Sequence, residues 1–161
     1  MDAAILFSDE AMNRYIIAIE TKYTDSLGLN TAKDNDLKMK TAFESGLFTK
    51  AGLTHINEGC TQIYRNFLLT EKYRMVHHLK DSYSIILAPK DHPSTESEIK
   101  SLQTNLKQEF HYKLKKYSLE DFVSSLRKSC PEEYKNWTDW FFERYLNFSK
   151  VEALLNEDKR L

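Results

Sequence analysis

The sequence lacks a strong net charge, and this limits the partners that it could bind. It has 161 residues, with 23 Lys and Arg against 24 Asp and Glu, which gives a formal net charge of −1. A basic field over the whole surface is therefore absent, and nucleic-acid binding would need a local patch. Cysteine is also scarce. Cys60 and Cys130 lie far apart and form no CxxC motif, which agrees with a reducing compartment.

Several other signals are missing, and each absence excludes a class of protein. Nothing near Met1 resembles a signal peptide or a membrane span, so a reducing cytoplasm and no membrane partner are expected. There is no Gly-x-Ser-x-Gly, no P-loop and no dinucleotide-binding glycine motif, which argues against serine hydrolases and the common nucleotide-binding folds. With 41% hydrophobic and 12% aromatic residues, the chain predicts one globular domain over residues 1–161.

One apolar stretch carries charge at its own end. In Tyr15–Tyr23 the side chains alternate, so that Ile16, Ala18, Glu20 and Lys22 share one face of a strand. Both faces are apolar until Glu20, which is typical of a central strand covered on both sides. Burial of a carboxylate and an ammonium group costs free energy because both lose their hydration. A divalent metal or a phosphate would compensate for that cost.

A second apolar stretch precedes this strand. The residues from Asp2 to Phe7 are followed by a polar turn, which predicts a β-hairpin with Tyr15–Tyr23. If its tip lies near Ala11 and Met12, paired positions sum to about 22 to 24, and Asp2 lies beside Glu20 to Lys22. Asp2 is therefore the candidate partner of Glu20.

The rest of the chain alternates between helical and extended patterns. Residues 24–59 predict a long connection with one short helix over Asp36–Ser45. The apolar spacing of Cys60–Val76 predicts an amphipathic helix that carries Gln62 and Arg65 beside its apolar stripe. The later elements expected are a strand at Ser82–Lys90, a helix from a Thr95/Glu98 capping box to about Tyr112, a short strand at Lys113–Tyr117, a helix capped by Ser118, and a last helix after Pro131. The Lys107, Lys113, Lys115 and Lys116 group is expected at a solvated surface, and the alternative is a patch that contacts phosphates.

The charged residues suggest a hydrolytic site. Carboxylates on adjacent strands can hold Mg²⁺ through hard oxygen ligands and leave positions for water and a phosphate oxygen. A lysine on the same face can orient the attacking water or help to deprotonate it, and can offset charge that develops on the phosphorus. This arrangement suits phosphodiester hydrolysis.

These motifs resemble those of the PD-(D/E)XK, or restriction-endonuclease-like, nuclease superfamily. The resemblance rests on Asp2-Ala-Ala-Ile-Leu-Phe, on Ile19-Glu-Thr-Lys22-Tyr-Thr-Asp25, and on Gln62-Ile-Tyr-Arg65 in the following helix. It is closer still to an incompletely characterised bacterial group with an Ile-Glu-x-Lys-Tyr-Thr-Glu strand and a late Glu-Arg-Tyr stretch, here Glu143-Arg-Tyr145. It spans nearly the whole chain.

The resemblance implies a fold and a set of roles. The fold would be α/β, with a small mixed sheet flanked by helices on both faces and with the first helix of the family fold missing. Asp2 and Glu20 would be ligands of Mg²⁺, which Mn²⁺ could replace, and the Thr21 carbonyl would complete the site. Lys22 would be the catalytic lysine and Gln62 an auxiliary residue. DNA would be the substrate, and the fold is compatible with a homodimer.

Each of these residues also has a structural interpretation. Asp2 could be a solvated terminal residue, Glu20 and Lys22 an ion pair at a strand end, and Gln62 the polar margin of a helix. The alternative function is accordingly a catalytically inactive nuclease-fold module that binds DNA or a protein partner. A third interpretation is a purely structural module.

Overall fold

The computed structural model describes residues 1–23, 29, 30, 35–147 and 149. The chain divides into two compact units, Met1–Tyr117 and Ser118–Leu161; that residues 1–161 form one domain stays a prediction. The first unit contains the sheets and four of the helices described below, and the second contains a helical pair. In the described part of the chain no helix is both long enough and apolar enough to cross a membrane.

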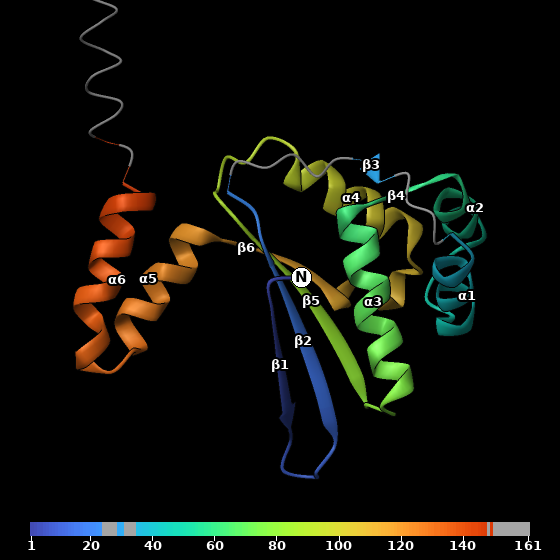
Figure 1. Ribbon diagram of the computed structural model, residues 1–161, viewed down its shortest axis with the longest axis horizontal. Helices are drawn as coiled ribbons and strands as arrows, with labels where there is room; N and C mark the ends of the chain where they lie inside the picture. Colours follow the sequence, from blue (N-terminus) through green and yellow to red (C-terminus); the bar gives the residue numbers. More distant parts are fainter. Residues whose placement is uncertain (24–28, 31–34, 148, 150–161) are drawn as a thin grey trace, which may run out of the picture. The chain divides into compact units, whose positions relative to one another are not determined.

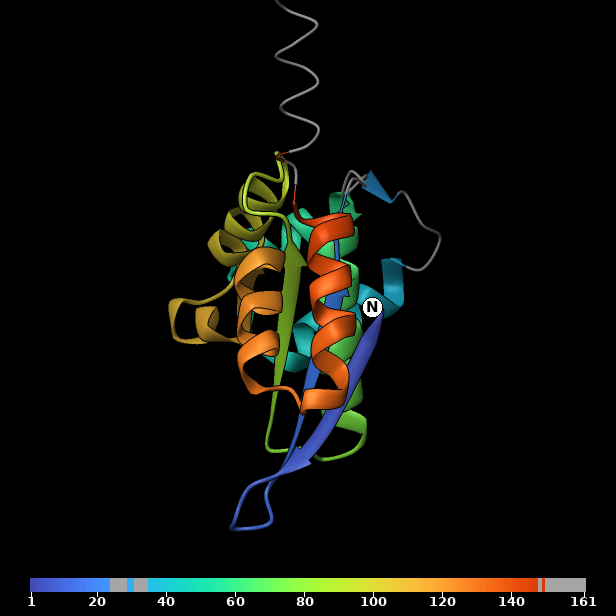
Figure 2. The ribbon, with the colours of Figure 1, turned by 90° about the vertical axis from the view of Figure 1, so that its left-hand side faces the viewer.

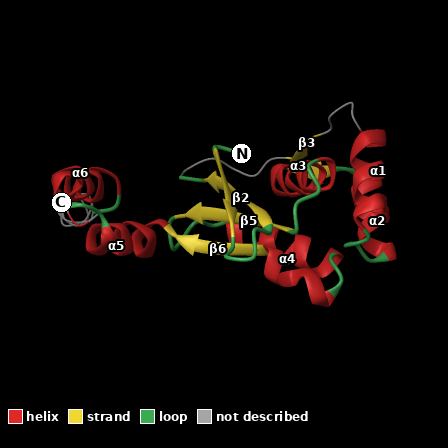
Figure 3. Ribbon diagram, turned by 90° about the horizontal axis from the view of Figure 1, so that it is seen from below, coloured by secondary structure: helices red, strands yellow, loops and turns green. Residues whose placement is uncertain are grey.

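The first unit is built on a four-stranded mixed sheet. Its strand order is β1 (Ala3–Ser8), β2 (Arg14–Thr21), β5 (Asp81–Ala88) and β6 (Leu114–Ser118). β1 runs antiparallel to β2, and β2 runs parallel to β5. Figure 3 shows β2, β5 and β6 side by side. This confirms the predicted α/β class with a small mixed sheet.

The β1–β2 hairpin has the register that the sequence predicts. Pairs run from Ala3 opposite Ile19 to Ser8 opposite Arg14, so paired numbers sum to 22. In the turn, the Asp9 carboxylate accepts hydrogen bonds from the Asn13 amide and the Tyr15 hydroxyl. The hairpin extends beyond the C-terminal end of α3 (Gln62–Val76) in two perpendicular views (Figures 1 and 2). Its register places Asp2 at the end of β2 that carries Glu20.

The predicted long connection contains more structure than the sequence indicates. α1 (Asn35–Ser45) is the expected short helix, but α2 (Lys50–Glu58) was not predicted. Thr49 caps α2 by accepting a hydrogen bond from the Gly52 amide at 3.0 Å. Gly52 suggests a loop, yet a Cβ there would lie 2.3 Å from the Asn105 carbonyl oxygen. The absence of a side chain at Gly52 therefore allows α2 to pack closely against the end of α4 (Thr95–Asn105).

A second, two-stranded sheet lies just before α3. In it β3 (Leu29–Asn30) pairs with β4 (Cys60–Thr61).

The helix predicted from Thr95 to about Tyr112 is shorter than expected. α4 ends at Asn105 because Leu106 is extended and forms a bridge with Phe48; a 3₁₀ helix, η1 (Gln108–Lys113), then leads into β6. The predicted capping box is also wrong. Ser94 is the N-cap residue, and the Thr95 hydroxyl hydrogen-bonds His92 Nδ1 at 2.7 Å instead.

α3 packs against β2 and β5, and the main core forms around it. Its buried apolar side chains meet those of the sheet, of α1, α2 and α4, and of the segments between them. The core residues are Ala42, Leu47, Phe48, Ile56, Cys60, Ile63, Tyr64, Phe67, Leu68, Ile86, Ile99, Leu102, Leu106 and Leu114. Burial of this apolar surface fixes α3 beside the end of β2.

The opposite face of the sheet is aromatic. Tyr112 of η1 lies near Tyr83 of β5, with ring centroids 6.2 Å apart. A hollow of about 410 Å³ lies on this face, lined by Phe7, Ile17, Tyr83, Ile85, Tyr112, Lys115 and Tyr117.

A buried ionic network joins α3, the start of β5 and η1. The Lys113 ammonium pairs with Glu71 Oε1 at 3.1 Å and also with Asp81, while Ser82 donates a hydrogen bond to Glu71. Glu71 is 0% exposed and Lys113 only 3%, so the expectation that Lys113 lies at a solvated surface is wrong. Burial favours a higher pKa for the Asp81 carboxyl, but hydrogen bonds from Lys113 and Tyr112 outweigh it and lower that pKa.

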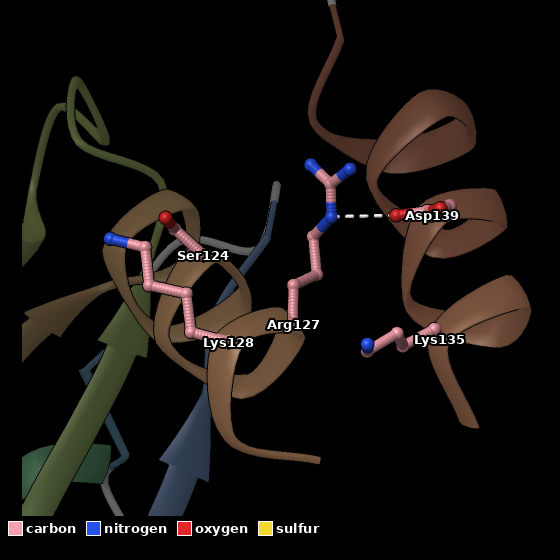
Figure 4. Close-up of a pocket in the computed structure, with 5 residues that line it drawn as sticks. All are labelled: Ser124, Arg127, Lys128, Lys135 and Asp139. Atoms are coloured by element: carbon pink, nitrogen blue, oxygen red, sulfur yellow. Dashed lines mark ion pairs between the residues drawn. The ribbon is translucent and has the colours of Figure 1, made fainter. Parts of the chain in front are cut away.

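The second unit is a pair of helices, α5 (Leu119–Ser129) and α6 (Glu132–Tyr145). Ser118 caps α5 as predicted, accepting a hydrogen bond from the Asp121 amide at 3.0 Å. Arg127 joins the two helices, because its guanidinium lies 2.6 Å from Asp139 Oδ1 and over the Phe142 ring. Figure 4 shows this ion pair in a cleft that Lys128 and Lys135 also line.

We predict that Lys113→Met destabilises the protein by about 3–5 kcal/mol, because it leaves the Glu71 carboxylate buried without its ammonium partner. Lys115→Met, in the exposed part of β6, is the matched control and should change stability by less than about 0.5 kcal/mol. Urea unfolding of the three proteins measures both changes. Equal stabilities would show that the network contributes nothing.

Candidate active site

Glu20 and Lys22 lie together at the end of β2. Alternation along the strand buries Ile16, Ala18 and Glu20 on the face that α3 covers. The Lys22 amide continues the pairing with β5 by donating to the Leu87 carbonyl at 2.7 Å. The Lys22 ammonium then lies 2.8 Å from Glu20 Oε1, as the predicted shared face requires.

Gln62, the first residue of α3, joins the two charged groups. Its Nε2 donates to Glu20 Oε1 at 2.7 Å, and its Oε1 accepts from the Lys22 ammonium at 2.7 Å. A side-chain amide can donate to a carboxylate and accept from an ammonium group at the same time. The structure therefore brings together three of the predicted residues, Glu20, Lys22 and Gln62.

Asn66 is a site residue that the sequence interpretation missed. It lies one helical turn after Gln62, and its Nδ2 donates to Glu20 Oε2 at 2.7 Å. Residues four apart share a helix face, so the spacing from Gln62 was a usable signal. Arg65, which was expected beside Gln62, makes no ion pair with Glu20 in the described part of the chain.

Asp2 lies beside Thr21. Its Oδ2 accepts a hydrogen bond from the Thr21 amide at 2.7 Å, and its own amide donates to the Ile19 carbonyl at 2.9 Å. The neighbouring Met1 α-amino group lies 2.5 Å from Glu20 Oε2. Asp2 is thus held at the same strand end as Glu20, as expected, while the direct contact with Glu20 comes from Met1.

The Glu20 carboxylate is buried and fully hydrogen-bonded. Glu20 is 3% exposed and Lys22 5%. Lys22 and Gln62 contact Oε1, while Met1 and Asn66 contact Oε2. A buried carboxylate is tolerated only when it is compensated in this way, and the cluster therefore fixes the orientation of each side chain in it.

The oxygen atoms at this end of β2 are of the chemical type that Mg²⁺ prefers as ligands. The Asp2 and Glu20 carboxylates and the Thr21 carbonyl are hard ligands, and Mg²⁺ is commonly held by one or two carboxylates with water completing its shell. Glu20 Oε2 already receives a cation, the Met1 ammonium. Within the described ranges no group of three or more His, Cys, Asp or Glu side chains could hold a metal. A metal here would therefore depend on Asp2, Glu20, a backbone carbonyl and water.

Comparison with known families identifies the type of domain. A family model described as Restriction Endonuclease associating with ARP (REase-ARP) matches residues 1–146. The chain belongs to the REase-ARP family. No curated protein and no solved structure matches it significantly. The match confirms the resemblance to restriction endonucleases, and it covers the segments that carry Asp2, Glu20, Lys22 and Gln62. Membership of the REase-ARP family suggests a nuclease, a hydrolase with DNA as its substrate.

We predict strong coupling between Glu20 and Lys22. Glu20→Gln should cost about 3–5 kcal/mol of stability, because Lys22 would stay buried without a counter-charge. The double variant Glu20→Gln/Lys22→Met should recover most of that loss, since the buried Lys22 ammonium is gone and the Met1 α-amino group, which also loses its partner, is partly exposed. A double-mutant cycle measured by urea unfolding gives the interaction free energy. Additive losses in the two single variants would rule out a coupled pair.

Proposed function

We propose that this REase-ARP protein is a metal-dependent nuclease that hydrolyses DNA phosphodiester bonds at the Glu20–Lys22–Gln62 cluster. The observation that carries the proposal is the hydrogen-bonded contact of these three side chains at the end of β2, with Asp2 anchored to Thr21 beside them. The family supports DNA as the substrate. Asp2 and Glu20, with the Thr21 carbonyl, are the proposed ligands of Mg²⁺ or Mn²⁺.

The metal, when bound, would supply positive charge that stabilises the phosphate as the bond breaks. The protein side chains would orient the reactants and stabilise the charge that develops. Lys22 would orient the attacking water through its ammonium group and offset negative charge on the phosphate oxygens. Its position 2.8 Å from Glu20 Oε1 directs its ammonium group towards a proposed ligand of the metal.

Gln62 and Asn66 are positioning residues in this scheme. The Gln62 amide holds Lys22 and Glu20 in one orientation, and Asn66 holds the second oxygen of Glu20. Side chains fixed by such contacts need little rearrangement as charge develops in the transition state. Both come from α3, so the packing of this helix on the sheet sets the geometry of the site.

We predict that the wild-type protein cleaves plasmid and linear DNA in Mg²⁺ or Mn²⁺, and that Asp2→Asn lowers the rate at least about a hundredfold. Asn at position 2 can still accept the hydrogen bond from the Thr21 amide, so this exposed substitution removes the charge and leaves the fold intact. Glu10→Gln, at the exposed hairpin turn, is the matched control and should cleave normally. Gel assays of supercoiled and linear DNA measure the rates.

Lys22 provides a second variant. Lys22→Ala should abolish cleavage, and circular dichroism should be recorded because the residue is buried. Cleavage that survives both EDTA and Lys22→Ala would come from a contaminant and would contradict the proposed site.

A second candidate function is a catalytically inactive nuclease-fold module that binds DNA or a protein partner. The observation that favours it is the saturation of Glu20, whose two oxygens are already contacted by Met1, Lys22, Gln62 and Asn66. In that case the cluster would be purely structural. Retained DNA binding without cleavage at any metal concentration would support this second function against the first.

A further inference from the structure

The N-terminus of α3 lies at the candidate active site and lacks its usual cap. Gln62 is the first residue of α3 and Thr61 is the N-cap residue, but the Thr61 side chain makes no capping hydrogen bond. The first turn contains no acidic residue either. The first amide groups of a helix lack partners within the helix and carry a partial positive charge. This end of α3 is therefore suited to an anion.

The Thr61 hydroxyl is the second observation at this position. Thr61 is only 8% exposed, and its Oγ1 is an enclosed polar atom without a hydrogen-bond partner in the described structure. Buried hydroxyl groups are nearly always hydrogen-bonded. A hydroxyl can donate to an anion oxygen, so a ligand at the helix end would satisfy it.

Lys38 adds a cation from α1. Lys38 is 9% exposed, and it makes no ion pair or hydrogen bond with any residue in the described part of the chain. Its helix, α1, packs against α3. Burial raises the pKa of the thiol of Cys60, the residue before Thr61, and the Lys38 charge opposes that rise. A largely buried ammonium group without a counter-charge among the residues that the structure describes is unfavourable, and an anion beside β4 would provide one.

We propose that Thr61, Lys38 and the first amides of α3 form a binding site for a phosphate group of the nucleic-acid backbone. The site lies next to the Glu20–Lys22–Gln62 cluster, because Gln62 directly follows Thr61. This proposal rests on the proposed function, because that function is the reason for taking DNA as the source of the phosphate. A phosphate diester offers several acceptor oxygens and a full negative charge, which match the hydroxyl, the ammonium and the helix end. Thr61 and Lys38 would hold a phosphate that flanks the bond to be cleaved.

The test measures DNA binding without cleavage. Fluorescence anisotropy of a labelled duplex in EDTA compares the wild-type protein with Thr61→Val, which removes only the hydroxyl, and Lys38→Met, which keeps the length of the side chain. Thr61→Val should weaken binding about fivefold and Lys38→Met about tenfold. Lys38→Met should also reduce the slope of log affinity against log salt by about one.

Two matched variants control for general effects. Lys40→Met removes an exposed lysine from α1, and Thr54→Val removes an exposed hydroxyl from α2; each should bind within about twofold of wild type. Thermal melting of each variant checks the fold. Binding by Thr61→Val and Lys38→Met equal to that of their controls, or no binding by the wild-type protein, would overturn the proposal.

Failure of this proposal can be distinguished from failure of the proposed function. Weakened binding by Thr61→Val and Lys38→Met, in a wild-type protein that never cleaves DNA, would support the phosphate site and contradict catalysis. Normal cleavage by wild type, with unaltered binding by both variants, would support catalysis and contradict the phosphate site.

Discussion

The buried carboxylate of Glu20 is the interaction on which the candidate site depends. It ends an apolar strand, and a charge in that position is stable only with several donors around it. Lys22 continues the same strand, whereas Gln62 and Asn66 come from α3. Compensation of one charge therefore requires β2 and α3 to meet in a fixed orientation, and that orientation defines the site.

α3 is anchored by polar contacts near both of its ends. Gln62 and Asn66 bind Glu20 near its start, while Glu71, further along, binds Ser82 and Lys113. The apolar side chains of the helix pack between these two points. Hydrophobic packing does not specify direction, but buried hydrogen bonds are satisfied in only one geometry. The two ionic clusters thus set how α3 lies across the sheet, and with it the position of the α3 N-terminus.

The sequence predicts the parts of this arrangement that follow from local pattern. Alternation along Tyr15–Tyr23 gives the shared face of Glu20 and Lys22, and the hairpin turn gives the register that brings Asp2 to the same end. These features depend on residues close in sequence or on a single strand pairing, for which periodicity is informative. Gln62 is different, because only the resemblance to restriction-endonuclease-like nucleases implied its place at the site, and its contacts join positions far apart in sequence.

The remaining features depend on tertiary contacts that no local pattern records. Asn66 reaches Glu20 only because of the rotation of α3 on the sheet. Gly52 suggests a loop when read alone, but it permits α2 to approach Asn105. Lys113 lies in a lysine-rich stretch, yet it is buried because Glu71, distant in sequence, needs a counter-charge. In each case a distant partner overrides the local expectation.

The most direct test of the account is a calorimetric titration of Mn²⁺ into the wild-type protein and into Asp2→Asn. If the two carboxylates hold a cation at the end of β2, the wild-type protein binds a single Mn²⁺ and the variant loses most of that affinity. Absence of binding to the wild-type protein, or equal binding to both, would contradict the metal site at Asp2 and Glu20.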